Sequence, residues 1–206
     1  MTKSFYRITT SETPETFLVN IHRDKGSVGP DTQGTLRYIP NQGFEVTMRC
    51  YEANPQAVYL NPNDPVCRDS CMEAFLDFYP DLPECGYINM EVNSKGVVLC
   101  GFGPIRFDRA RVLDLGCKHP EINVTMAEEN GRPYWQIQYI IDHAFLETLY
   151  QRPCDFKPGH RIKGNFYKCG DRTNSPHWSS WSPIADEDFN TIGFHCPNSF
   201  GDLQIV

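Results

Sequence analysis

The sequence lacks the features that mark membrane-spanning, nucleic-acid-binding and disordered proteins. No stretch approaches the roughly 18 consecutive apolar residues that a membrane helix needs, so we expect no membrane partner. There is no run of like charges, and 19 Lys and Arg residues against 26 Asp and Glu residues give a net charge of −7. We therefore expect no nucleic-acid partner. Hydrophobic residues make up 40 % of the chain, which excludes a disordered polypeptide.

An internal repeat and a low-complexity linker are also missing. The 206 residues fit one domain of generous size, and we expect a single domain over residues 1–206. We therefore expect no attached catalytic domain, and the sequence does not predict the oligomeric state. The first residues lack the apolar core of a signal peptide, which predicts a cytoplasmic protein.

The nine cysteines form no recognisable disulfide or metal-binding pattern. Their number is odd and no export signal accompanies them, so we interpret them mostly as reduced thiols. The spacing Cys67-x3-Cys71 has no second pair at a zinc-like distance. Four aspartates could include calcium ligands, although no calcium-loop motif connects them: Asp69, Asp171, Asp186 and Asp188. We therefore expect no cofactor, and a structural calcium ion is left open.

Short strands dominate the predicted secondary structure, because glycine and proline recur at short intervals. One hairpin is predicted from residues 87–93, a turn at 94–96 and a return over 97–100. In a second hairpin, residues 122–126 and 134–141 flank an Asn-Gly turn.

Further strands and one helix complete the prediction. The strands cover residues 43–51, 70–79, 161–168 and 201–206. A short helix is predicted over His143–Tyr150, with Asp142 as its N-cap. The fold class is therefore all-β, an antiparallel β-sandwich of jelly-roll-like form with roughly nine or ten strands and one short helix.

Alternation in two of these strands gathers polar side chains on one face. In residues 71–78 and 87–93 the period of two places most apolar side chains on a common face. If the two strands are neighbours, the opposite face presents Glu73, Asn89 and Glu91 to the outside. Such a face suits sugar hydroxyls, although a merely solvated sheet face has the same pattern.

Two of the three tryptophans lie three residues apart in a segment rich in Ser, Pro and His. Trp178 and Trp181 are expected in a loop, where an exposed ring suits stacking on the apolar face of a pyranose. Alternatively, one or both rings fold back on the core. Trp135 lies in an alternating strand and is expected in the core.

Two enzymatic or redox functions remain as alternatives. Glu73 and Glu91 could serve as general acid and base in a cytosolic sugar-processing enzyme of the glycoside hydrolase type, but the sequence does not fix their separation. A haem-binding electron-transfer domain would use Met90 with His177 or His195 as axial ligands. No local signature supports a Cys/His nucleophile.

Several segments together resemble one protein family. They are residues 66–75 (VCRDSCMEAF), 87–96 (YINMEVNSKG) and 164–171 (GNFYKCGD), followed by Pro176-His177, Trp181-Ser182-Pro183 and the terminal Phe200-Gly201-Asp202-Leu203. In this order the chain resembles small bacterial proteins built on the family 9 carbohydrate-binding module, within the wider DOMON-like β-sandwich group. The resemblance implies an antiparallel β-sandwich that binds glycan chain ends, monosaccharides or oligosaccharides in a cleft walled by tryptophans.

The resemblance also implies roles for particular residues. Glu73 corresponds to a residue that hydrogen-bonds sugar hydroxyls. The aromatic position before the Asp-Ser-Cys motif is Cys67 here, so Trp178 or Trp181 has to complete the second stacking wall, or that wall is lost. Some family members bind calcium structurally. We expect a non-catalytic carbohydrate-binding protein linked to carbohydrate catabolism, with a carbohydrate ligand as its partner. Its candidate binding residues are Arg68, Glu73, Asn89, Glu91, Gln138, Asn165, Tyr167, Lys168, His177, Trp178 and Trp181.

Overall fold

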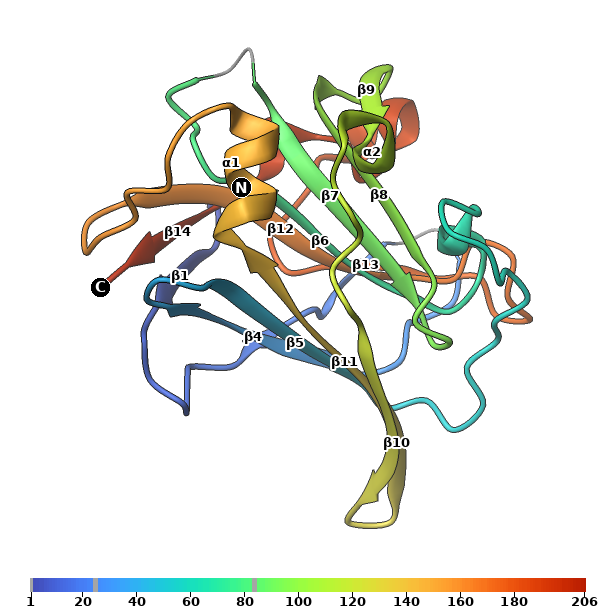
Figure 1. Cartoon of the computed structure of the whole chain (residues 1–206). Helices are drawn as coiled ribbons and strands as arrows, with labels where there is room; N and C mark the ends of the chain where they lie inside the picture. The colour runs from blue at the N-terminus through green and yellow to red at the C-terminus, as the bar shows by residue number, and fades with distance from the viewer. Residues whose placement is uncertain (1, 24–25, 83–84) are drawn as a thin grey trace.

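The computed structural model describes residues 2–23, 26–82 and 85–206, which form two β-sheets packed against each other (Figure 1). The larger sheet has nine strands and the smaller has five. Among the pairings of named strands in the described ranges, all are antiparallel except that of the first strand with the last. The predicted all-β sandwich is confirmed.

The larger sheet carries the segments in which the family resemblance lies. In spatial order its strands are β1 (Phe5–Ile8), β14 (Gly201–Ile205), β12 (Arg161–Cys169), β6 (Cys71–Asp77), β7 (Tyr87–Asn93), β8 (Val98–Ile105) and β9 (Asp108–Arg111). In addition, β13 (Trp178–Ser180) pairs with β12, and β3 (Ile21–His22) pairs with β13. Strands β12, β6 and β7 are therefore adjacent at the centre, although β12 lies far from the other two in the sequence.

The smaller sheet closes the sandwich on the opposite side. In spatial order its strands are β10 (Asn123–Glu129), β11 (Arg132–Asp142), β5 (Gly43–Cys50), β4 (Thr32–Ile39) and β2 (Phe17–Leu18). The hairpin of β10 and β11 extends beyond the body of the molecule (Figure 1). Its turn places Asn130 and Gly131 at φ 53° and 76°, the left-handed conformation predicted from the Asn-Gly pair.

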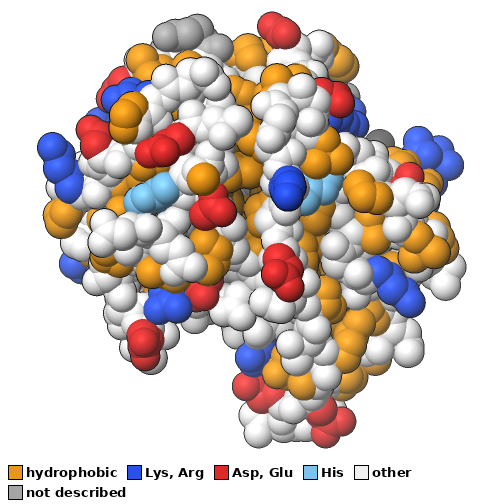
Figure 2. Space-filling model, in the orientation of Figure 1, with side chains coloured by type: hydrophobic (Ala, Val, Ile, Leu, Met, Phe, Trp, Pro, Cys, Tyr) orange, Lys and Arg blue, Asp and Glu red, His pale blue; other side chains and the backbone are white. Residues whose placement is uncertain are grey.

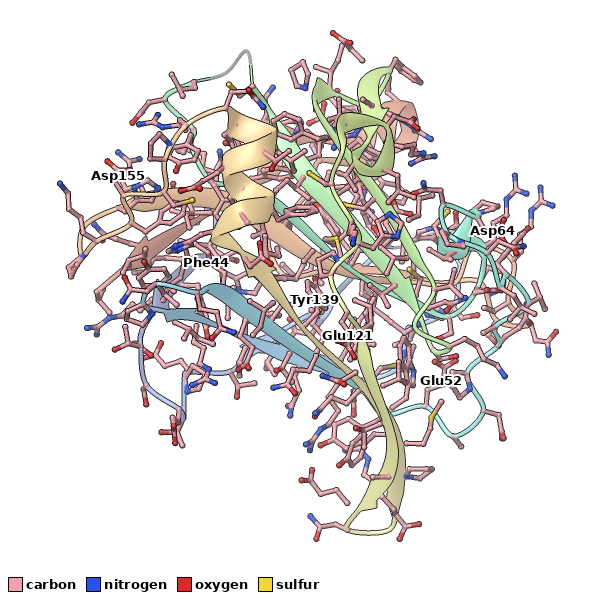
Figure 3. The ribbon with its side chains drawn as sticks, in the orientation of Figure 1. Phe44, Glu52, Asp64, Glu121, Tyr139 and Asp155 are labelled. Atoms are coloured by element: carbon pink, nitrogen blue, oxygen red, sulfur yellow. The ribbon has the colours of Figure 1, made fainter. Side chains whose placement is uncertain are left out.

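The main core lies between the two sheets. Alternate residues of β6, including Met72 and Leu76, face the smaller sheet, and Phe44 and Tyr139 meet them from β5 and β11 (Figure 3). Trp135 is fully buried there, as predicted.

The predicted helix α1 (His143–Tyr150) covers one end of this core. The Asp142 carboxylate accepts a hydrogen bond from the Phe145 amide at 2.7 Å, so the predicted N-cap is confirmed. Phe145, Leu146 and Leu149 recur on one face of the helix and are buried against the core.

The described residues contain more elements than the sequence predicts, with fourteen strands in place of roughly nine or ten. Five of them, β1, β2, β3, β9 and β13, have two to four residues, which is too short for an alternating pattern to be visible. A second helix, α2 (Asp186–Ile192), was also not predicted. Three short 3₁₀ turns, η1 (Val66–Arg68), η2 (Val112–Leu115) and η3 (Pro197–Ser199), join the strands.

Acidic and basic side chains are mixed over the face shown in Figure 2, with no large area of one sign. Within the described part of the chain, no helix has the length and apolar character that crossing a bilayer requires.

Candidate functional site

The polar face of the larger sheet is buried, whereas the strand pattern predicts that it faces the outside. Strands β6 and β7 are neighbours, as expected, and Glu73 lies directly opposite Glu91. Yet Glu73, Asn89 and Glu91 are only 2 %, 1 % and 5 % exposed. The C-terminal segment folds over this face, where Phe194 and Phe200 form a second apolar cluster with residues of the sheet. Alternation places a side chain on a face, but it does not show what covers that face.

A cleft with two lobes remains beside this cover. The smaller lobe has a volume of about 120 Å³ and is lined by Glu73 and Trp178 among others. The larger lobe has a volume of about 350 Å³ and is lined by Asn89 and Arg109 among others. The two lobes adjoin, because both are lined by Cys67, Glu91, Arg106 and His195.

Two buried carboxylates on adjacent strands line the cleft. Burial raises the pKa of Glu73 well above its ordinary value, and the charge of Glu91 raises it further. Burial also raises the pKa of Glu91 to about 7, against the hydrogen bond that Asn89 Nδ2 donates to Glu91 Oε1 at 2.9 Å. Near neutral pH the pair therefore carries a proton, so it can both donate a hydrogen bond to a ligand hydroxyl and accept one.

Arg109, on β9, fixes the orientation of Asn89. Its Nε and Nη2 atoms donate to Asn89 Oδ1 at 3.0 Å and 2.6 Å. The guanidinium lies 4.1 Å from the centre of the Tyr87 ring. It also donates to the backbone carbonyls of Tyr87, Gly101 and Gly103. Because Oδ1 is held by Arg109, the amide nitrogen of Asn89 points to Glu91, and the polar side of the cleft is rigid.

The two neighbouring tryptophans have different surroundings. Trp178 is half-buried and lines the smaller lobe, and its Nε1 donates to Asp171 Oδ1 at 2.6 Å. Trp181 is only 8 % exposed and packs in the main core against Phe17 and Phe166. The expectation of an exposed two-tryptophan loop is therefore wrong for Trp181. Residues 178–180 form a strand, and two side chains three positions apart along extended chain point to opposite sides.

Two predicted binding residues support the cover and do not line the cleft. The Tyr167 ring stacks on the Phe194 ring with centroids 4.1 Å apart, and its hydroxyl donates to the Phe194 carbonyl at 3.1 Å. Asn165 bonds both the amide and the carbonyl of Ser182. Both side chains are fully buried, so the structure places them in the packing beneath the C-terminal segment.

Lys168 and His177 form a separate buried network. Lys168 follows Tyr167 on β12 and therefore points to the other face of the sheet. Its Nζ donates to His177 Nε2 at 2.8 Å and to Ser70 Oγ at 3.0 Å, and it lies 3.8 Å from a carboxylate oxygen of Glu52. Neither Lys168 nor His177 lines either lobe.

The last two predicted residues lie elsewhere. Arg68, in η1, directs its Nη1 to the Tyr59 hydroxyl at 3.4 Å. Gln138 lies on β11 of the smaller sheet and lines a different pocket, of about 610 Å³, together with Glu121 (labelled in Figure 3). The alternating pattern around Gln138 predicts a strand, but it does not show which of the two sheets contains that strand.

The structure adds several cleft residues that the sequence does not indicate. They are Arg106 and Phe107 between β8 and β9, Asp171 after β12, and Phe189 in α2. His195, considered above only as a haem ligand, also lines the cleft, and its Nδ1 is hydrogen-bonded to the Tyr87 hydroxyl at 2.9 Å. Burial lowers the pKa of His195 to about 3, so the ring is neutral. These residues come from short turns and one seven-residue helix, and only tertiary contacts bring them together.

The candidate calcium ligands do not converge. The buried Asp69 carboxylate accepts from the amides of Val58 and Tyr59 and from Asn93 Nδ2, and Asp186 pairs with Arg23. In the described ranges, the one group of three or more potential metal ligands includes no aspartate. The donor set therefore does not fit a calcium ion.

The candidate haem ligands do not converge either. Met90 lies in the main core, while His195 lines the cleft on the opposite side of the sheet. Both ring nitrogens of His177 are engaged, by Lys168 and by the Ser175 carbonyl. The haem hypothesis therefore has no pair of axial ligands.

Comparisons with known proteins connect this geometry to a family. Residues 37–205 match the family model described as carbohydrate-binding family 9. The chain belongs to this family. The resemblance proposed from the sequence segments is thus confirmed.

Two solved structures share the fold of this family 9 chain. One is a candidate carbohydrate-binding protein from Bacteroides uniformis, with a TM-score of 0.77, 23 % identity and all of both chains covered. The other is a family 9 module from Caldicellulosiruptor kristjanssonii in complex with cellotriose, with a TM-score of 0.60, 11 % identity, and 98 % of this chain and 93 % of that one covered. No curated protein matched the sequence.

Proposed function

We propose that this family 9 protein binds a single sugar ring or the end of a glycan chain in the two-lobed cleft, without chemical conversion. The observation that supports this most directly is that the ring of Trp178 and the carboxyls of Glu73 and Glu91 line one small lobe. A pyranose has an apolar face and a rim of hydroxyls. An aromatic ring beside convergent hydrogen-bonding groups complements both.

The polar groups of the cleft suit the hydroxyl rim. Glu91 is held by Asn89, and Arg106 and His195 approach from the cover side. Hydrogen bonds from or to charged groups are stronger than neutral ones, and a buried position protects them from water. Since Arg109 holds Asn89, little side-chain entropy is lost when a ligand is bound.

A replacement for the wall lost at Cys67 is available in the larger lobe. Phe107 lines this lobe together with Cys67, and its side chain is 80 % exposed. An exposed aromatic ring beside polar groups suits stacking on the apolar face of a sugar. We infer that Phe107 stacks on the bound sugar from the side opposite Trp178.

The size of the smaller lobe favours a short ligand. Pockets that enclose a drug-sized molecule have volumes of roughly 300 Å³ or more, whereas this lobe has about 120 Å³. The smaller lobe alone is therefore too small for a drug-sized ligand, and any further sugar units extend through the larger lobe towards Phe107.

Calorimetric titration against gluco- and xylo-configured mono- and oligosaccharides, including cellotriose, tests the proposal. Phe107→Ala should weaken binding by roughly 1–3 kcal/mol, the range for losing one large apolar contact. Phe5→Ala is a matched control, since Phe5 is 59 % exposed on β1 and lines neither lobe. The absence of heat with every sugar at millimolar concentration contradicts the proposal.

The Glu73 and Glu91 pair also supports a second function, hydrolysis of a glycosidic bond. Two carboxyls with raised pKa values on adjacent strands are the groups that general acid and base catalysis uses. Incubation with a broad panel of chromogenic glycosides distinguishes the two functions. Turnover that Glu91→Gln abolishes while sugar binding persists would establish the enzyme.

The biological setting stays a prediction. A cytoplasmic location, a link to carbohydrate catabolism, a bacterial source and the wider DOMON-like grouping are consistent with the proposed function. Cell fractionation tests the location, and growth experiments on different carbon sources test the link to catabolism.

A further inference from the structure

Two cysteines and a glutamate converge on the outer face of the larger sheet, beneath the smaller lobe. Cys71 and Glu73 belong to β6 and alternate onto the same face, and Cys169 of β12 lies directly opposite Cys71. The two sulfur atoms and a carboxylate oxygen all lie within 4.8 Å of one another. Sγ of Cys169 is 3.0 Å from Glu73 Oε1.

Among the described residues, none gives the Glu73 carboxyl a strong hydrogen-bond donor or a cation in direct contact. It is 2 % exposed, and in the described part of the chain its hydrogen bond comes from the Cys169 thiol. A thiol is a weak donor, and buried carboxyls in proteins are usually paired with a cation or several strong donors. The neighbouring Glu91 and Asp171 line the same lobe and add negative charge. The cluster therefore has the charge that a bound cation neutralises.

Separations in the cluster agree with the coordination of one small ion. Two sulfurs bound to one zinc ion at about 2.3 Å lie about 3.8 Å apart when the geometry is tetrahedral. In this cluster the two sulfur atoms lie within 4.8 Å of each other, a range that includes this value.

An entry path and a fourth coordination position are also present. Glu73 and Cys169 both line the smaller lobe, so an ion can reach them from the cleft. The other described cysteines in this region do not share the arrangement: Cys196, for example, is buried but its Sγ lies 3.2 Å from the Ser199 hydroxyl. Three protein ligands and one side open to a cavity are typical of zinc sites that keep a water or ligand position.

We propose that Cys71, Glu73 and Cys169 bind a thiophilic divalent cation of the zinc class, with a fourth position open to the cleft. On binding, both thiols release their protons to solvent, a protonated Glu73 does the same, and two sulfur–metal bonds and one oxygen–metal bond form. No electron is transferred. Two thiolates in the ligand set favour zinc, cadmium or cobalt over calcium and magnesium. Glu73 belongs to both the metal site and the sugar cleft, but none of the three metal contacts requires a bound sugar.

Metal titration of the full-length protein, reduced and freed of metal with a chelator, tests the site. With Co²⁺ as the probe, we expect a thiolate charge-transfer band in the near ultraviolet that saturates at one equivalent and is displaced by Zn²⁺. Cys169→Ser and Glu73→Gln should each weaken Zn²⁺ binding more than tenfold, since even second-shell changes cost about 10–100-fold. Cys196→Ser is the matched control, because Cys196 is a buried thiol of the C-terminal segment that covers the sheet, and its loss should leave affinity unchanged.

Several results would overturn the proposal. They are a Co²⁺ spectrum without thiolate bands, or equal loss of affinity in Cys196→Ser and Cys169→Ser. The proposal is also overturned if the mass of the native protein is lower by two hydrogens and Cys71 and Cys169 are disulfide-linked after purification under reducing conditions. If a ligand variant does not fold, proton release on adding Zn²⁺ to the native protein still decides the matter. Sugar titration in the presence and absence of Zn²⁺ separates failure of this site from failure of the sugar site.

Discussion

Truncating the two tryptophans separately should affect different properties of the protein. Trp181 is 8 % exposed, and its ring packs 5.7 Å from Phe166 and 6.3 Å from Phe17, measured between centroids. Trp181→Ala therefore leaves a cavity in the main core and should lower the free energy of unfolding by about 3–5 kcal/mol. For a chain of this length each kcal/mol lowers Tm by roughly 2–4 °C, so a drop of at least about 6 °C is expected.

Trp178→Ala should act on binding. Its ring is half-buried and lines the smaller lobe, so removing it takes away a stacking surface worth roughly 1–3 kcal/mol. This corresponds to a rise in Kd of about 5-fold to 150-fold. Trp178→Phe keeps most of the stacking surface but not the Nε1 bond to Asp171, and it should bind better than the alanine variant.

Urea unfolding and calorimetric sugar titration, applied to both variants, measure these two effects. Sugar affinity should be close to native for Trp181→Ala under conditions where it is folded, and its loss of stability should exceed that of Trp178→Ala. The reasoning is refuted if Trp181→Ala keeps native stability, or if Trp178→Ala binds sugar as well as the native protein does.

Further predictions concern the support of the cleft, the helix cap and pH. Arg109→Met should destabilise the fold by about 2–4 kcal/mol in urea unfolding and weaken sugar binding, because it leaves Asn89 Oδ1 and buried backbone carbonyls without donors. Asp142→Ala should cost about 1 kcal/mol of unfolding free energy and leave sugar affinity unchanged, since it removes only the cap of α1. Burial and the Lys168 charge lower the pKa of His177 from 6.5 to about 4, so its contribution to stability is complete above pH 6.5 and is lost as the pH falls to about 4. Compared with His177→Gln, the native protein should therefore lose up to about 3 kcal/mol more across this interval.

Each of these predictions has a contrary outcome. A stable Arg109→Met protein with native affinity would mean that Asn89 holds its orientation without the guanidinium. An affinity change in Asp142→Ala would connect α1 to the cleft, which the structure does not. A constant stability difference between native protein and His177→Gln from pH 6.5 to 4 would show that His177 titrates alike in the folded and unfolded chains.

Local order could be predicted from the sequence because its causes are local. The two hairpins, the Asn130-Gly131 turn and the Asp142 cap depend on residues close together in the chain. The inner faces of β6 and β7 follow from a period of two, and so does the shared face of Glu73 and Glu91. The family resemblance also depends on short segments that follow one another in a fixed order along the chain, and the match to the family model confirms it.

Only the tertiary structure decided which side chains form the cleft. The period of two assigns Trp178 and Trp181 to opposite sides once residues 178–180 are known to form a strand that leads to Trp181, yet three residues are too few to reveal that strand. The C-terminal segment covers the polar face through contacts such as Tyr167 with Phe194, and no periodic pattern encodes them. Composition and alternation were enough to predict a sandwich in which one sheet has a polar face. Long-range packing decided that this face would be a buried cleft, because burial depends on what folds over a strand and not on the strand itself.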